Sequence, residues 1–90
     1  MLEKIDHLGI AVRDWEAALA RYTTLTGGPP QHIEEVPAQK VKVAMFEVGA
    51  SRVELLLPTA PDSPIAKFIE KRGEGMHHIC FKVAYLDEAL

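Results

Sequence analysis

The chain has 90 residues, of which 48% are apolar and 26% charged, and its formal net charge is −3 at pH 7. This length allows one small domain or part of a larger one, and the mild acidity argues against nucleic acids and anionic membranes, which require clustered Lys and Arg. No apolar run approaches the roughly 20 residues that cross a bilayer. The single cysteine, Cys80, cannot form an internal disulfide, so we expect a cytoplasmic protein.

The first predicted element is a strand over residues 4–12, which places His7 among small side chains on one face. The other face carries an apolar stripe for the core (Leu8, Ile10 and Val12). Asp14 is a favourable helix N-cap, and apolar residues at helical spacing predict an amphipathic helix over residues 15–26 that ends at Gly27.

Three strands are predicted next, over residues 31–36, 41–48 and 52–57. The first is polar and is expected at an edge, and the last two are joined by a tight turn at Gly49. Ser63 then caps a second helix, with Pro64 at its first position and Gly73 after its end. A strand over residues 76–83 and the start of a third helix from Leu86 complete the chain.

An internal repeat relates the first strand to the last. Two six-residue segments lie 71 positions apart, and each begins with His and ends with Val: His7–Val12 and His78–Val83. We therefore expect an α+β fold of paired βαβββ modules. The first module takes residues 1–58, a linking helix takes 59–75, and residues 76–90 begin a second module that this sequence does not complete.

His7, Glu54 and His78 are the candidate metal ligands. The two histidines hold equivalent positions in the repeat, and Glu54 lies within an otherwise apolar strand, where a carboxylate is costly to bury unless it is paired or bound to a metal. Two imidazoles and one carboxylate suit a divalent metal ion. The alternative is an exposed glutamate on a sheet face and two hydrogen-bonded histidines near strand starts.

The adjacent pair His77-His78 requires a choice, because neighbours on a strand point to opposite faces. The repeat selects His78, which matches His7. His77 is then expected to point toward the packing side or to cap the strand, and His32, in a polar strand, is expected at the surface.

These residues resemble the vicinal-oxygen-chelate (glyoxalase-like) superfamily, and within it the methylmalonyl-CoA epimerases. The resemblance covers essentially the whole chain but only about two-thirds of a typical family member, so the chain is expected to be truncated at its C-terminus. Its most specific parts are the start of the second predicted helix, within Asp62–Phe68, and the histidine pair, within Gly75–Ile79. The stretches that carry it are Ile5–Val12, Glu35–Val41, Val53–Pro58, Asp62–Phe68 and Gly75–Ile79.

The resemblance implies that His7, Glu54 and His78 bind a divalent ion, with cobalt, manganese, zinc and nickel not distinguished. It places a fourth ligand, a glutamate, beyond Leu90. The implied reaction interconverts (2R)- and (2S)-methylmalonyl-CoA by removal and return of the α-proton through a metal-stabilised enolate. It also implies a homodimer. Catalytic acid–base residues and cofactor-binding residues for the CoA group are not assigned.

Two other functions stay open. The chain could belong to another enzyme of the same superfamily, such as a glyoxalase or a ring-cleaving dioxygenase, which reuse these ligand positions. It could also be a metal-free small-molecule-binding protein of the same fold, although three ligand residues would have no role in a sequestering cleft.

Overall fold

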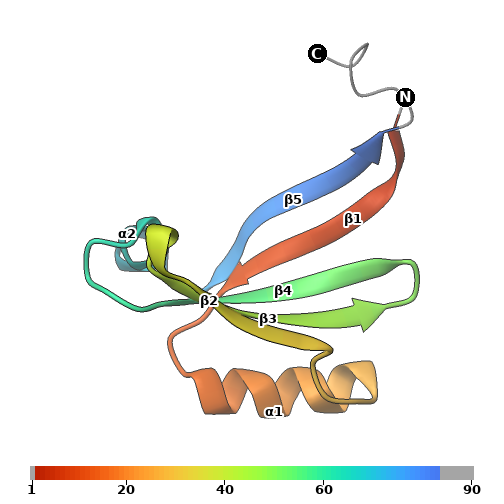
Figure 1. Cartoon of the computed structure of the whole chain (residues 1–90), viewed down its shortest axis with the longest axis horizontal. Coiled ribbons are helices and arrows are strands. Elements are labelled where there is room, and N and C mark those ends of the chain that lie inside the picture. The colour runs from red at the N-terminus through yellow and green to blue at the C-terminus, as the bar shows by residue number, and fades with distance from the viewer. Residues whose placement is uncertain (1, 84–90) are drawn as a thin grey trace.

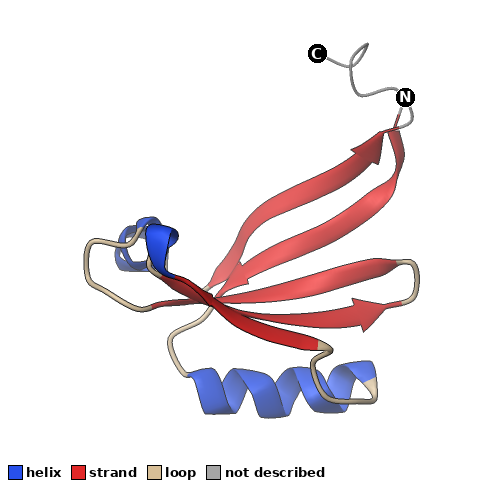
Figure 2. Ribbon diagram, viewed as in Figure 1, coloured by secondary structure: helices blue, strands red, loops and turns tan. Residues whose placement is uncertain are grey.

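A computed structural model describes residues 2–83, which form a five-stranded sheet and two α-helices (Figures 1 and 2). This is the predicted α+β class. The helix expected from Leu86 lies outside the described residues, and within them no helix is long and apolar enough to span a membrane. In chain order the elements are β1 (Leu2–Ala11), α1 (Trp15–Thr26), β2 (His32–Val36), a 3₁₀ helix (Pro37–Gln39), β3 (Val41–Val48), β4 (Ser51–Pro58), α2 (Pro64–Arg72) and β5 (Gly75–Val83).

The strand order in the sheet is β2-β3-β4-β1-β5. β1 lies between β4, to which it is parallel, and β5, to which it is antiparallel, while β2, β3 and β4 pair antiparallel. Figure 1 shows β1 and β5 side by side along one flank of the sheet. The two histidine strands of the sequence repeat are therefore direct neighbours, and the polar strand β2 lies at the opposite edge, as predicted.

The helix ends follow the predicted capping residues. The Asp14 carboxylate accepts a hydrogen bond from the Ala17 backbone N–H at 3.0 Å, and Gly27 ends α1 with a left-handed φ of 84°. The Ser63 hydroxyl oxygen accepts from the Ile65 backbone N–H at 3.1 Å, which begins α2. These contacts confirm both predicted helices.

Two apolar clusters cover opposite faces of the sheet. Neighbouring residues on one strand, Val43 and Ala44 on β3, belong to different clusters because side chains alternate across a strand. α1 packs against one face (Figure 2), in a cluster that contains Val12, Ala18, Ala44, Phe46 and Leu55. α2 packs against the other face, in a cluster that contains Ala11, Val41, Val43, Leu56, Ile65 and Ile69.

The pairing of β1 with β5 contains a bulge at Asp6. Ile5 is the register partner of Phe81 and His7 is the partner of Cys80, so Asp6 is an extra residue on β1. An extra residue disrupts the regular alternation of side chains. Asp6 and His7 can therefore approach each other although they are adjacent in the sequence.

A second bulge lies at His77 on β5. Gly9 is the register partner of His78 and Ile10 is the partner of Met76, so His77 is the extra residue. The prediction that His77 turns away from the face of His78 assumed an unbroken strand and is wrong. The bulge brings both histidine rings to the same side, where they line one cavity.

Candidate metal centre

Three neighbouring strands bring the predicted ligands together. His7 lies on β1, Glu54 on β4 and His78 on β5. Gly9 lies on β1, which is the middle one of these three strands, and it is the register partner of both Glu54 and His78. Because Gly9 has no side chain, the space above it stays open, and the flanking carboxylate and imidazole can meet the ring of His7, which lies two residues along the same strand.

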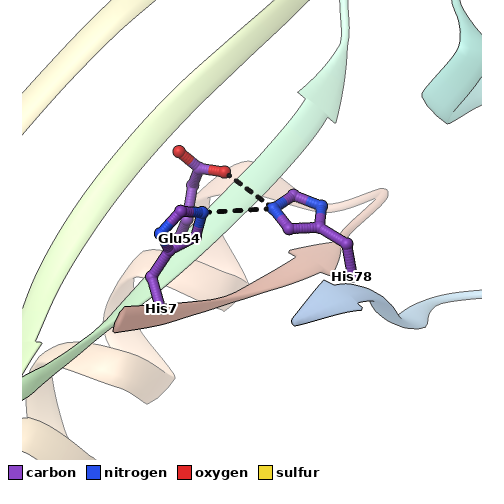
Figure 3. A group of neighbouring side chains, drawn as sticks. All are labelled: His7, Glu54 and His78. Atoms are coloured by element: carbon purple, nitrogen blue, oxygen red, sulfur yellow. Dashed lines mark hydrogen bonds and ion pairs between the residues drawn. The ribbon is translucent and has the colours of Figure 1, made fainter. Parts of the chain in front are cut away.

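The ligand atoms of these three side chains converge (Figure 3). Each residue offers one donor atom, and the three atoms lie within 4.8 Å of one another. His7 Nε2 lies 3.3 Å from His78 Nε2, and His78 Nε2 lies 3.5 Å from Glu54 Oε1. The two imidazole rings are almost perpendicular, at 89°. Among residues 2–83, the group whose donor atoms have metal-ligand spacing therefore consists of the three candidate residues.

Partial burial shapes the charge state of the centre. The side chains of His7 and Glu54 are 19% and 18% exposed, and that of His78 is 36% exposed. Burial lowers the pKa of His78, the Glu54 carboxylate opposes this shift, and the neighbouring His7 and His77 rings add to it. Because its pKa is lowered, the His78 ring stays neutral at pH values below the ordinary pKa of histidine. A neutral imidazole has the lone pair that a metal ligand needs.

Gly9 makes a close approach to His78 that no other residue type would permit. A Cβ atom added at position 9 would lie 2.2 Å from Cε1 and 2.6 Å from Nε2 of the His78 ring. The ring therefore rests directly over the backbone of β1. This contact fixes the position of the His78 ligand atom relative to the other two.

Asp6 contacts the ring of His7 on the side away from His78. One oxygen of Asp6, Oδ2, lies 2.9 Å from His7 Nδ1 and 2.6 Å from Nη2 of Arg52. The hydrogen bonds from His7 and then Arg52 lower the pKa of Asp6. The His7 ring is thus held at Nδ1 while Nε2 points into the centre.

A cavity of about 320 Å³ opens beside Glu54 and His78. The 3₁₀ helix and strands β2, β3 and β4 contribute most of its wall, and the start of α2 and β5 contribute the rest. The apolar lining residues are Val36, Val41, Val43, Met45, Leu56, Pro64 and Ile65, and the polar ones are His32, Glu34, Gln39, Glu54, His77 and His78.

The two histidines that were not chosen as ligands also border this cavity. His77 packs edge-on against Phe68, and its Nδ1 lies 3.0 Å from Nδ1 of His78. His32 is exposed, as predicted, and pairs with Glu34 at 3.3 Å. Neither histidine belongs to the converging group of three donors.

The donor set fits a divalent transition metal. Two neutral imidazole nitrogens and a carboxylate oxygen are the ligands that zinc, cobalt, nickel and manganese accept. Three protein ligands leave further coordination positions for water or a substrate, which is typical of catalytic rather than structural sites. Glu54 and His78 also line the cavity, so a bound ion would be accessible from it.

Comparison with known families agrees with this fold. Residues 6–90 match the family model described as "Glyoxalase/Bleomycin resistance protein/Dioxygenase superfamily". The chain belongs to this superfamily. The resemblance seen in the sequence is thereby confirmed at the level of the superfamily.

Individual relatives are similar over nearly the whole chain. YqjC of Bacillus subtilis, an uncharacterized protein, is 42% identical over 89 residues, which are 99% of this chain and 64% of that protein. Human mitochondrial methylmalonyl-CoA epimerase is 38% identical over 90 residues, which are 99% of this chain and 51% of the relative. The chain thus spans between half and two-thirds of the length of these relatives.

A solved structure shares the fold. A variant of Streptomyces coelicolor methylmalonyl-CoA epimerase in complex with 2-nitronate-propionyl-CoA matches with a TM-score of 0.86 and 39% sequence identity. The match covers 99% of this chain and 68% of that one.

The sequence indicates only part of what supports the three donors. Gly9 is one of the small residues that leave room beside His7, but its close approach to His78 depends on the pairing of β1 with β5. The contacts of Asp6 with His7 and Arg52 depend on a bulge and on the pairing of β1 with β4, and nothing in the linear sequence indicates either.

Proposed function

We propose that this chain takes part in the metal-dependent epimerisation of (2R)- and (2S)-methylmalonyl-CoA. The observation that carries the proposal is the convergence of His7, Glu54 and His78 to within 4.8 Å beside a largely apolar cavity. Relatives named methylmalonyl-CoA epimerase support the choice of substrate, and one structural relative of that name holds 2-nitronate-propionyl-CoA.

His7, Glu54 and His78 would hold a divalent ion through His Nε2 atoms and a carboxylate oxygen. When bound, such an ion supplies Lewis-acid chemistry, which stabilises negative charge on the thioester oxygen as the α-proton leaves. A carboxylate ligand would offset part of the positive charge of the ion, whereas imidazole ligands bind through a neutral lone pair.

The cavity would hold the small acyl group beside the three ligands. Val43, Leu56 and Ile65 supply an apolar wall that suits a methyl substituent. These side chains are buried in the cluster under α2, so their positions are set by the core of the domain. An apolar wall also excludes water, and this strengthens electrostatic interactions within the site.

Epimerisation requires a base that removes the α-proton and an acid that returns one from the opposite face. The titratable side chains that line the cavity among residues 2–83, apart from Glu54 and His78, are His32, Glu34 and His77. A mutational search for the acid and base in this part of the chain should begin with these three.

The test is exchange of the α-proton. The purified protein is incubated with Co²⁺ and (2S)-methylmalonyl-CoA in deuterium oxide, and the C2 proton signal is followed by NMR alongside the appearance of the (2R) isomer. We expect deuterium at C2 and interconversion of the isomers. We expect both to be lost in Glu54→Ala and to persist in Glu47→Ala, which removes an exposed glutamate from the neighbouring strand β3.

Two results would contradict the proposal. Absence of exchange together with glyoxalase or dioxygenase activity would assign the chain to another reaction of the superfamily. Absence of both metal binding and exchange would favour a metal-free binding protein of the same fold.

We further propose the division into a first βαβββ module (residues 1–58), a linking helix (59–75) and the start of a second module (76–90). A cytoplasmic homodimer is also proposed, and the single Cys80 is compatible with a reducing compartment. Light scattering of the purified protein tests the assembly, and the mass of a monomer at micromolar concentration would contradict the homodimer.

A further inference from the structure

We propose that Asp6 and Arg52 are a positioning pair that fixes the tautomer and the orientation of His7 as a metal ligand. The inference rests on the proposed metal centre. Neither residue has a donor atom in the group of three, so the role is indirect. It is carried by a chain of contacts that runs from Arg52 to Asp6 and from Asp6 to His7.

The contacts are short and share one atom. Oδ2 of Asp6 accepts a hydrogen bond from Nη2 of Arg52 at 2.6 Å and lies 2.9 Å from Nδ1 of His7. On the other side of the His7 ring, Nε2 faces Nε2 of His78 at 3.3 Å. One ring nitrogen of His7 thus contacts a carboxylate, and the other points into the centre.

The chemistry of the partner decides the tautomer. An ionised carboxylate has no proton to donate, so the hydrogen bond requires the proton on Nδ1 of His7. The lone pair of the neutral ring is then on Nε2, the atom that points into the centre. Histidines that bind metals usually donate their other ring N–H to a carboxylate or carbonyl in this way, which fixes the ring and makes it a better ligand.

The backbone explains how two adjacent residues make this contact. In a regular strand Asp6 and His7 would point to opposite faces. The bulge at Asp6 breaks the alternation, and bulges are frequent next to active sites, where they re-aim a side chain.

Arg52 reaches Asp6 from β4, where it is the register partner of His7. A guanidinium is always charged and donates through several N–H groups, so it holds the carboxylate in place without competing for the metal ion.

The competing explanation is an ordinary surface ion pair, which contributes little to stability and has no role at the centre. Asp6 is 27% exposed and Arg52 is 44% exposed, so partial exposure alone does not separate the two explanations. They differ in what they predict for His7. An ordinary ion pair leaves the tautomer and the metal affinity unchanged when Asp6 is replaced.

The first experiment reads the tautomer in the metal-free protein. Long-range ¹H–¹⁵N NMR spectra at pH 8 distinguish a protonated Nδ1 from a protonated Nε2. We expect the Nδ1–H form for His7 in the wild type and in Asp6→Asn, whose amide oxygen can still accept. In Asp6→Ala we expect a shift toward the Nε2–H form. A wild-type His7 protonated at Nε2 would overturn the inference, whether or not the protein binds metal.

The second experiment is a Co²⁺ titration followed by the visible absorption of the ion. We expect about 10- to 100-fold weaker binding in Asp6→Ala and a smaller loss in Asp6→Asn and Arg52→Ala. The matched control is Asp62→Ala, which removes another aspartate paired with a basic residue, Lys40, outside the centre. Circular dichroism checks that each variant folds.

The outcomes separate this inference from the proposed function. If the wild type binds Co²⁺ and Asp6→Ala binds it equally well with an unchanged spectrum, the positioning role is wrong and the metal centre stands. If the wild type binds no Co²⁺, the proposed function fails, and with it the role of the pair at a metal centre.

Discussion

The contact between Gly9 and His78 gives the sharpest prediction about the centre. In Gly9→Ala the new methyl carbon would lie 2.2 Å from Cε1 of His78, whereas carbon atoms pack favourably at about 3.5–4.0 Å. The ring must therefore withdraw by more than about 1 Å. Metal–ligand distances tolerate changes of only about 0.2 Å. The displaced ring can then share an ion with His7 and Glu54 only at a distorted geometry.

We expect Gly9→Ala to bind Co²⁺ about 10- to 100-fold more weakly than the wild type, a loss typical of changes to the groups that support metal ligands. Gly9 does not have a left-handed φ, so alanine is compatible with the backbone and the clash is the main perturbation. The assay is a calorimetric or optical titration with Co²⁺, after circular dichroism has shown that the variant is folded.

Gly28→Ala is the matched control. It introduces the same methyl group at a position with no atom within 4 Å of the new carbon and without a left-handed φ. Wild-type affinity in Gly9→Ala would mean that the His78 ring is not a ligand or is not held over β1. An equal loss in Gly28→Ala would point to a general loss of stability.

Three further predictions concern the histidines, the ion and an ion pair. His78→Ala should abolish Co²⁺ binding, whereas His77→Ala should leave it largely intact, as titration of both variants will show. An ion at 100 times its Kd should stabilise the fold by about 2.7 kcal/mol and raise the Tm by roughly 10–20 °C in a thermal melt. Lys40 lowers the pKa of Asp62 from 3.8, so the stability from this pair is present above pH 3.8 and is lost as pH falls through the lower folded-state pKa. Asp62→Asn should therefore flatten the acid decline of the unfolding free energy below about pH 4.

Each of these has a contradicting result. Equal metal loss in His77→Ala and His78→Ala would refute the choice between the two histidines. A Tm that does not respond to Co²⁺, or that responds equally in His78→Ala, would place any bound ion elsewhere. An unchanged acid decline in Asp62→Asn would show that the pair with Lys40 contributes nothing to stability.

Local sequence signals predicted the helices and the edge strand well. The bounds of α1 follow from Asp14 and Gly27 because capping depends on a side-chain oxygen at one end and a permitted left-handed φ at the other. The polar strand β2 was placed at an edge because its residues offer little apolar surface to bury. These features are encoded within a few neighbouring residues.

The convergence of His7, Glu54 and His78 could also be anticipated, because the repeat fixed the phase of His7 and His78 without knowledge of the tertiary structure. The direction of the His77 side chain could not be predicted. Strand alternation holds only while the pairing is regular, and the bulge depends on the register of β5 against β1. A register between distant strands is a tertiary property that the local pattern does not encode.

The contacts that support the three candidate ligands could not be predicted from the sequence for the same reason. Arg52 and Asp6 are 46 positions apart and meet only because β1 and β4 are parallel neighbours. The approach of His78 to Gly9 likewise requires two strands separated by most of the chain to pair in one particular register. The sequence thus singled out the three candidate residues, and the strand pairing shows how they are brought together.

The metal centre is tested most directly by a crystal of the protein grown with Co²⁺ and measured at the cobalt absorption edge. We predict an anomalous peak bonded to Nε2 of His7, Nε2 of His78 and a carboxylate oxygen of Glu54, at about 2.0–2.2 Å from each. A peak that omits any of these three side chains, or no peak among them at saturating Co²⁺, would show that they do not form a metal centre.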